Sequence, residues 1–102
     1  MNKYILDKDH NPVACNDTDE WGSWFQDASH RIVAQHTKGK ARVSTIFLGL
    51  DHNYELFKGS MKNYQPILFE TMIFGGEHDE YQERYATWDE AVAGHAKALE
   101  MI

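Results

Sequence analysis

Four residues of this 102-residue sequence are candidates for catalysis: Asp51, His52, Glu70 and His95. Carboxylates and imidazoles are side chains that exchange protons with substrates, and a carboxylate can hold an imidazole in place for acid–base work. Asp51 and His52 follow an apolar run, at the end of an expected strand, where a rigid backbone presents side chains to a ligand. Asp and Asn also terminate strands, so a turn explains Asp51-His52-Asn53 equally well.

Glu70 interrupts an apolar run, residues 67–74, that is expected to form an interior strand. A buried carboxylate must be paired, hydrogen-bonded or protonated. Arg84 lies close to opposite if the next connection is a simple hairpin, and Arg42 and His95 are other possible partners. Two hypotheses stay open: a paired carboxylate that fixes the sheet register, or Glu70 and His95 facing one shared pocket. His95, on the apolar side of the last helix, is likewise either a hydrogen-bonded core residue or part of that pocket.

Other kinds of site find little support in the sequence. It contains no HExxH or DxD motif and no histidine–carboxylate pair at metal-ligand spacing, so we expect no metal and no cofactor. Gly75-Gly76 is followed by acidic residues, which repel phosphate. Cys15 precedes an expected helix N-terminus, a position that can lower a thiol pKa, but no histidine partner is specified.

The overall charge argues against broad contact with nucleic acid or anionic lipid. The chain has 10 basic and 16 acidic residues, a net charge of -6 and a pI near 5.4. Its long-range field therefore repels phosphate backbones and acidic membrane surfaces. No apolar run approaches the roughly 20 residues that span a bilayer. The single cysteine excludes an intrachain disulfide, and a lone thiol suits a reducing cytoplasm.

Periodicity and turn residues predict one compact α+β domain over residues 1–102. The strands are expected at 3–6, 13–15, 31–36, 42–50, 67–74 and 81–85, and the helices at about 17–28 and 88–101. A hydrophobic content of 42% is sufficient for one core. We expect a mostly antiparallel sheet of four to five strands, with two helices packed on one face. The connection 51–66 is long for a compact domain.

Each expected helix carries a start signal and an apolar stripe. Asp17 with Glu20, and Thr87 with Glu90, have the spacing of capping boxes. The first stripe is aromatic, and the second is aliphatic with His95 on it: Trp21, Trp24, Phe25 and Ala28 in the first, and Trp88, Val92, Leu99 and Ile102 in the second. Both stripes predict helix faces that pack against the sheet.

Three blocks of the sequence, VSTIFLGLDHN, PILFETMIFGG and RYATWDEAVAGH, together with the opening YILD, NPVAC and EWGSWF, resemble a family of small tailed-bacteriophage proteins. The resemblance spans nearly the whole chain. It supplies no activity to carry over. It implies a phage protein made in the host cytoplasm, with an accessory or host-interaction role.

Three functions are therefore considered. The first is a phage accessory protein without catalysis that binds, and in doing so inhibits, a host protein such as a defence enzyme. Its contact surface is expected to be acidic: Asp17, Asp19, Glu20, Glu77, Asp79 and Glu80. The second is a small-molecule-binding protein or minor enzyme, with a pocket formed by Asp51, His52, Glu70, Arg84 and His95. The third is a virion or assembly component that forms a homo-oligomer.

Overall fold

The structure is a computed structural model that describes residues 2–53 and 65–102. The expectations for the long connection 51–66 fall mainly on residues 54–64, which lie outside this range. The described residues form an α+β fold, as predicted. A small hairpin consists of β1 (Tyr4–Leu6) and β2 (Pro12–Ala14). The main sheet contains β3 (Ile32–Lys38), β4 (Ala41–Phe47), β5 (Phe69–Phe74) and β6 (Gln82–Tyr85), and the helices are α1 (Thr18–Gln26), the short η1 (Ala28–His30) and α2 (Trp88–Glu100).

The main sheet is antiparallel throughout, and its strands lie in chain order, β3-β4-β5-β6. A tight turn joins β3 to β4, with Gly39 at a φ of 61°. Gly75 follows β5 at a φ of 82°, and a Cβ there would lie 2.2 Å from the carbonyl oxygen of Lys40. Only glycine fits that position, because both the backbone conformation and the close approach exclude a side chain.

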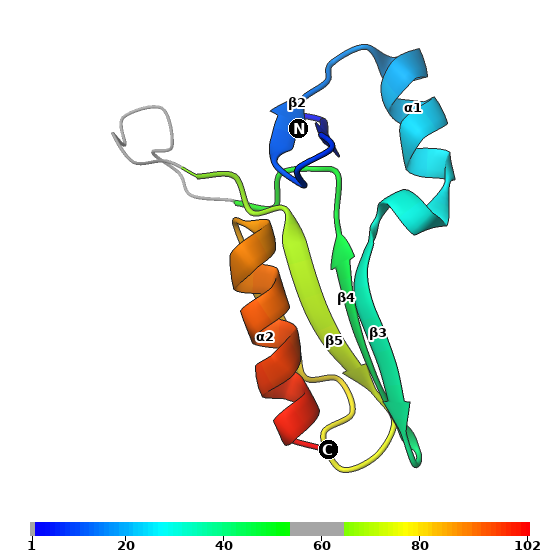
Figure 1. The fold of residues 1–102 in the computed structure, drawn as a ribbon, viewed down its shortest axis with the longest axis vertical. Helices are drawn as coiled ribbons and strands as arrows, with labels where there is room; N and C mark the ends of the chain where they lie inside the picture. Colours follow the sequence, from blue (N-terminus) through cyan, green and yellow to red (C-terminus); the bar gives the residue numbers. More distant parts are fainter. Residues whose placement is uncertain (1, 54–64) are drawn as a thin grey trace.

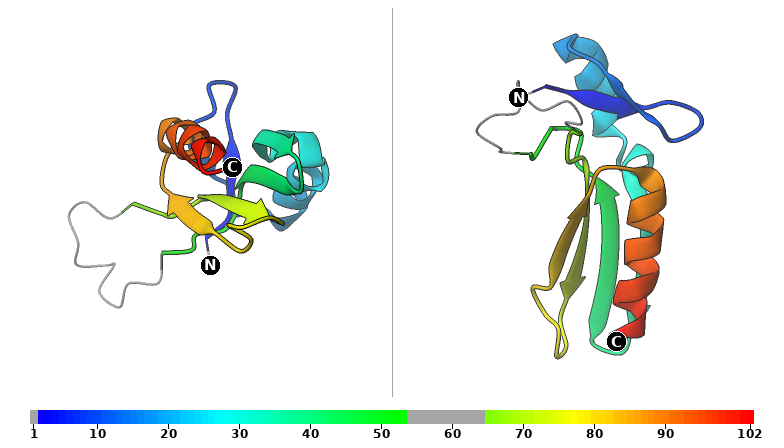
Figure 2. Two further views of the ribbon diagram at one scale, coloured as in Figure 1. Left: turned by 90° about the horizontal axis from the view of Figure 1, so that it is seen from below. Right: turned by 90° about the vertical axis from the view of Figure 1, so that its left-hand side faces the viewer.

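Helix α2 runs along one face of the main sheet and contacts all four strands (Figures 1 and 2). Its predicted capping box is present, since Thr87 and Glu90 each accept the other's backbone N–H. The predicted apolar stripe is partly wrong, because Val92 is 48% exposed. The buried residues are instead small or polar: Ala91, Gly94, His95 and Ala98. Small side chains let the helix backbone come close to the strands.

Helix α1 and the β1–β2 hairpin lie beyond one end of the main sheet, away from the C-terminus (Figure 1). The Trp24 ring packs edge-on against Phe47 at 5.6 Å, which joins α1 to the covered side of the sheet. Strand β4 ends at Phe47 and not at the predicted residue 50. Gly49 turns the chain there with a φ of 76°, and the Phe25 ring occupies the space beside its Cα.

The core between α2 and the sheet contains two apolar clusters. One is aromatic, near α1, and its buried residues are Leu6, Phe47, Leu68, Phe69 and Ala91. The other lies near the C-terminus and contains Ala41, Val43, Ile73 and Ala98. On the face that α2 covers, one buried polar residue of each element lies between the two clusters: Thr45 on β4, Thr71 on β5 and His95 on α2. These three residues are the centre of the candidate site.

Candidate functional site

A chain of hydrogen bonds crosses the core beneath α2. The Nδ1 atom of His95 lies 2.7 Å from the Thr45 hydroxyl, which lies 2.6 Å from the Thr71 hydroxyl. On its other side, His95 Nε2 lies 2.8 Å from Nδ1 of His36 on β3. We call His36, His95, Thr45 and Thr71 the polar band. It runs from the exposed edge strand β3 to the interior strand β5.

Strand register brings the two threonines together. Thr45 and Thr71 are direct partners across β4 and β5, so their side chains leave the sheet on the same face. Both threonines are fully buried, and His95 is 4% exposed. Buried polar groups are stable only when they are hydrogen-bonded, and each member of the band has a partner. The band therefore fixes the position of α2 along the sheet.

The surroundings of His95 keep its imidazole neutral. Burial lowers the pKa of His95, and the neighbouring His36 lowers it further. A neutral imidazole donates one N–H and accepts at the other nitrogen, which suits a chain in which every group does both. The hypothesis of a hydrogen-bonded core histidine is thus supported by the geometry. Sequence reasoning missed His36, Thr45 and Thr71 as its partners; the available signal was a threonine at the centre of each of two apolar strands.

Tyr85 on β6 lies next to the polar band. Its hydroxyl is buried, and among the described residues it makes no hydrogen bond of acceptable geometry. Burial raises the pKa of Tyr85, although the nearby Thr71 hydroxyl opposes the rise. The Tyr85 hydroxyl lies against Gly94, where a Cβ would be only 2.0 Å away. Gly94 is therefore the contact point at which α2 accommodates the ring.

Glu70 lies on the opposite face of the sheet from His95. Side chains alternate along a strand, and Thr71 points to the helix, so its neighbour Glu70 points away. Its carboxylate accepts from Arg84 Nε at 2.9 Å and from the Gln82 side chain, and Arg84 is its register partner. The predicted pairing with Arg84 is therefore observed. The alternative hypothesis, a pocket shared by Glu70 and His95, is wrong, because the sheet separates the two residues.

Removing the arginine tests how far this pair stabilises the fold. Glu70 is 8% exposed, whereas the Arg84 side chain is 39% exposed, so solvent screens the pair in part. We expect Arg84→Met to lower the unfolding free energy by about 1–2 kcal/mol at pH 7, because the carboxylate loses a charged donor. Urea unfolding measures the loss. The double variant Glu70→Met/Arg84→Met should regain part of this loss. With the single variant Glu70→Met it completes a double-mutant cycle, and losses of unfolding free energy that simply add in that cycle would contradict the coupling.

Asp51 acts as a turn residue at the end of the sheet. Its carboxylate accepts the backbone N–H groups of Asn53 at 2.8 Å and Ile67 at 3.0 Å, and it is 5% exposed. The backbone N–H of His52 donates to the Ile67 carbonyl oxygen. These bonds join the two sides of the long connection. The hollow beside Glu70 is lined by neither Asp51, His52 nor His95, so the predicted common pocket is not formed there.

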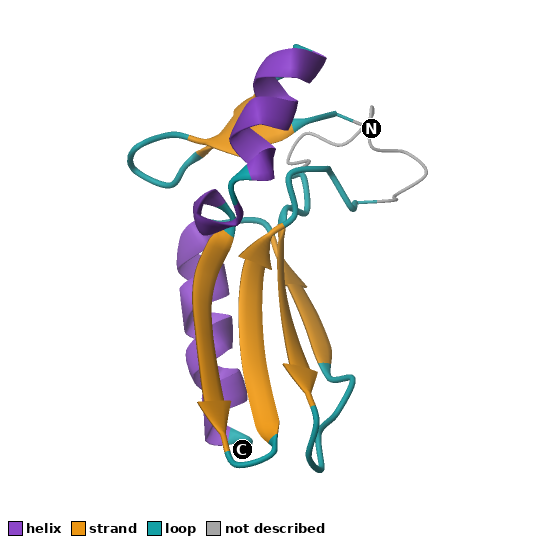
Figure 3. Cartoon of the chain, turned by 90° about the vertical axis from the view of Figure 1, so that its right-hand side faces the viewer, coloured by secondary structure: helices purple, strands orange, loops and turns teal. Residues whose placement is uncertain are grey.

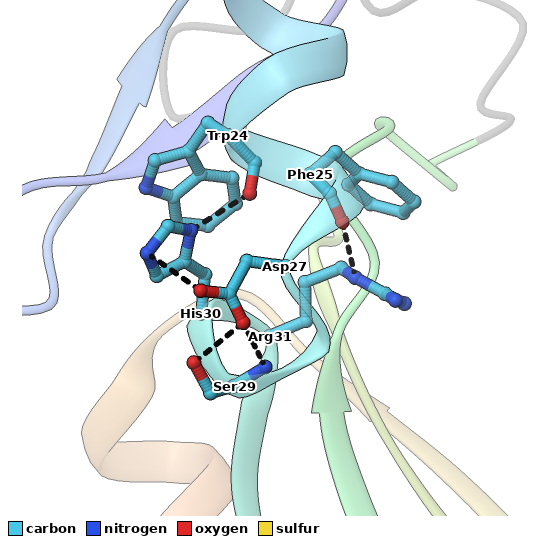
Figure 4. Close-up of polar contacts among 6 residues, drawn as sticks. All are labelled: Trp24, Phe25, Asp27, Ser29, His30 and Arg31. Carbon is cyan, nitrogen blue, oxygen red and sulfur yellow. Dashed lines mark hydrogen bonds and ion pairs between the residues drawn. The ribbon is translucent and has the colours of Figure 1, made fainter.

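The corner between α1 and β3 contains an aspartate, a serine and a histidine (Figure 4). Asp27 accepts from the Ser29 hydroxyl at 2.7 Å, and these contacts with Ser29 lower the pKa of Asp27. The His30 ring uses Nδ1 to bond the Trp24 carbonyl oxygen. The serine therefore donates to the carboxylate and not to the imidazole, so His30 is not placed to activate it as a nucleophile. The group closes the corner.

The other predicted chemical groups are dispersed. Cys15 is buried, and burial together with nearby Glu20 raises its thiol pKa, contrary to the lowering suggested by its place before a helix. Asp79 accepts the Gly75 N–H within its turn. Among the described residues, no three histidine, cysteine or acidic side chains are grouped to hold a metal ion. No helix in the described part of the chain is long and apolar enough to cross a membrane.

No protein family, curated protein or solved structure matches the chain.

Proposed function

We propose that this chain is a phage accessory protein that binds a host protein in the host cytoplasm, without catalysis of its own. The observation that supports the proposal is the sheet face turned away from α2, which Figure 3 presents toward the viewer with α2 behind the strands. We call it the open face. Register and alternation place these side chains on it: Ile32, Gln35, Thr37, Arg42, Ser44, Ile46, Glu70, Met72, Phe74, Gln82 and Arg84.

The open face has the composition of a protein contact surface. Phe74 is 40% exposed and Ile32 is 38% exposed. Ile46 and Met72, also on this face, are half-buried. Aromatic residues, methionine and arginine are the types enriched where proteins bind one another. The hydrogen bonds of the polar band, by contrast, are satisfied inside the fold. The proposal therefore rests on the open face.

The predicted acidic contact surface is divided by the fold. Asp17, Asp19 and Glu20 lie at the start of α1, and Glu77, Asp79 and Glu80 lie in the β5–β6 turn at the far end of the main sheet (Figure 1). Asp17 also caps α1 by accepting the N–H groups of Asp19 and Glu20. Residues so far apart do not form one patch, so they support the proposal less than the open face does.

Capture from bacterial host lysate tests the proposal with two matched variants. Phe74→Gln removes an exposed apolar side chain from the open face, and Val92→Gln removes one from the outer surface of α2. We expect a partner that wild type and Val92→Gln retain and that Phe74→Gln binds at least tenfold less strongly. Circular dichroism confirms that each variant is folded. Equal capture by all three proteins, or by none, would contradict the proposal.

A further inference from the structure

The open face is positively charged on a molecule that is negatively charged as a whole. Its described residues include Arg42, Arg84 and one acidic residue, Glu70, which is bonded to Arg84, so their net charge is +1. The full chain has a net charge of -6, so the remaining surface is still more acidic. Complementary charge steers a partner and selects its orientation. An acidic segment is therefore attracted to this face and repelled by the rest of the surface.

The two arginines lie at opposite corners of an apolar strip. The Arg42 guanidinium stacks over the Phe74 ring at 4.9 Å, and Arg84 comes from β6, opposite Glu70 at the other end of β5. Strand spacing and rise put their Cα atoms about 16 Å apart along a diagonal across the sheet. Between them lies a hollow of about 40 Å³, lined by Ser44, Ile46, Glu70, Met72 and Phe74. Such a hollow accepts the end of one aliphatic side chain and is too small for a base or a cofactor.

From this arrangement we infer that the open face binds an acidic amphipathic segment of its partner protein, an inference that rests on the proposed function. One aliphatic side chain of the segment enters the hollow, and neighbouring apolar groups cover Phe74. Carboxylates on either side reach Arg42 and Arg84. A helix with carboxylates about 11 residues apart spans that distance. Single-stranded RNA fits less well, because base stacking uses several exposed aromatic side chains, and Phe74 is the one aromatic among the described residues of the open face.

Selection from a library of random 20-residue peptides on the immobilised wild-type protein tests the inference. We expect enriched peptides to be rich in Asp and Glu around Leu or Met. An enriched peptide should bind about tenfold more weakly to Arg42→Gln and to Arg84→Gln, and equally well to Lys97→Gln, a control on the exposed side of α2. Arg42→Gln leaves the Glu70–Arg84 pair in place, so its result does not depend on the stability of that pair.

Basic or neutral consensus peptides, no enrichment, or unchanged binding to the arginine variants would overturn the inference. Tight binding of a random-sequence single-stranded RNA 20-mer at physiological salt would overturn it in favour of nucleic acid. Lysate capture separates the two proposals. If Phe74→Gln loses the partner and neither arginine variant does, the proposed function is supported and the inference of an acidic segment is wrong. No loss with any of them removes both.

Discussion

Replacing Gly94 with alanine is expected to lower the unfolding free energy by about 1–3 kcal/mol. A Cβ at this position would lie 2.0 Å from the Tyr85 hydroxyl and 2.2 Å from its ring carbon Cζ, both packed between α2 and β6. The phenol or the helix must shift, and a shift of the helix disturbs the hydrogen bonds of the adjacent His95. Urea unfolding monitored by circular dichroism gives the free energy.

The matched control is Gly22→Ala in α1, where nothing lies within 4 Å of the added methyl group. Alanine is favoured over glycine within a helix by about 1 kcal/mol, so this variant should be neutral or stabilised. Adding Tyr85→Leu to Gly94→Ala replaces the phenol ring with a smaller side chain, and this should restore part of the stability that Gly94→Ala loses. A Gly94→Ala protein as stable as the Gly22→Ala protein would show that α2 does not pack closely at Tyr85.

The stability of the fold should fall as the pH drops below about 6.5. The folded pKa of His95 is lowered by burial and by His36, so the unfolded chain binds a proton more readily than the folded one. The loss begins near the ordinary histidine pKa of about 6.5 and continues until the folded state also takes up the proton, at up to about 1.4 kcal/mol per pH unit. Within the described part of the chain, His95 is hydrogen-bonded to His36 and Thr45 and, through Thr45, to Thr71, and none of these is a carboxylate that would offset the charge.

The geometry of the histidine pair adds to this effect. A protonated His95 carries an N–H group on both ring nitrogens, so neither nitrogen can any longer accept a hydrogen bond from His36 or Thr45. His95→Gln should be less stable than wild type at pH 7 and should show a flatter dependence between pH 7 and 5. His78→Asn, in the β5–β6 turn, is the control and should keep the wild-type dependence. An unchanged slope in His95→Gln would assign the pH effect to other groups.

Local sequence signals correctly predicted much of this protein. Thr87 and Glu90 mark the start of α2, and Gly39 marks the turn between β3 and β4, because these residue types satisfy specific backbone requirements. Alternation along residues 42–50 places Val43, Thr45 and Phe47 on one face, and all three are buried. The pairing of Glu70 with Arg84 followed from a simple hairpin register.

The tertiary structure alone decided which of these residues meet. Alternation shows that Glu70 and Thr71 point to opposite faces, but it does not show which face α2 will cover, and that choice separated Glu70 from His95. The rotation of α2 was also set by packing, since the close approach of Tyr85 brings Gly94 to the sheet and turns Val92 outward. His36 and His95 are 59 positions apart, so no local spacing links them. The apolar runs within residues 42–74 thus predicted the sheet. The docking of α2 decided which face of the sheet holds the polar band and which face is left as the candidate binding surface.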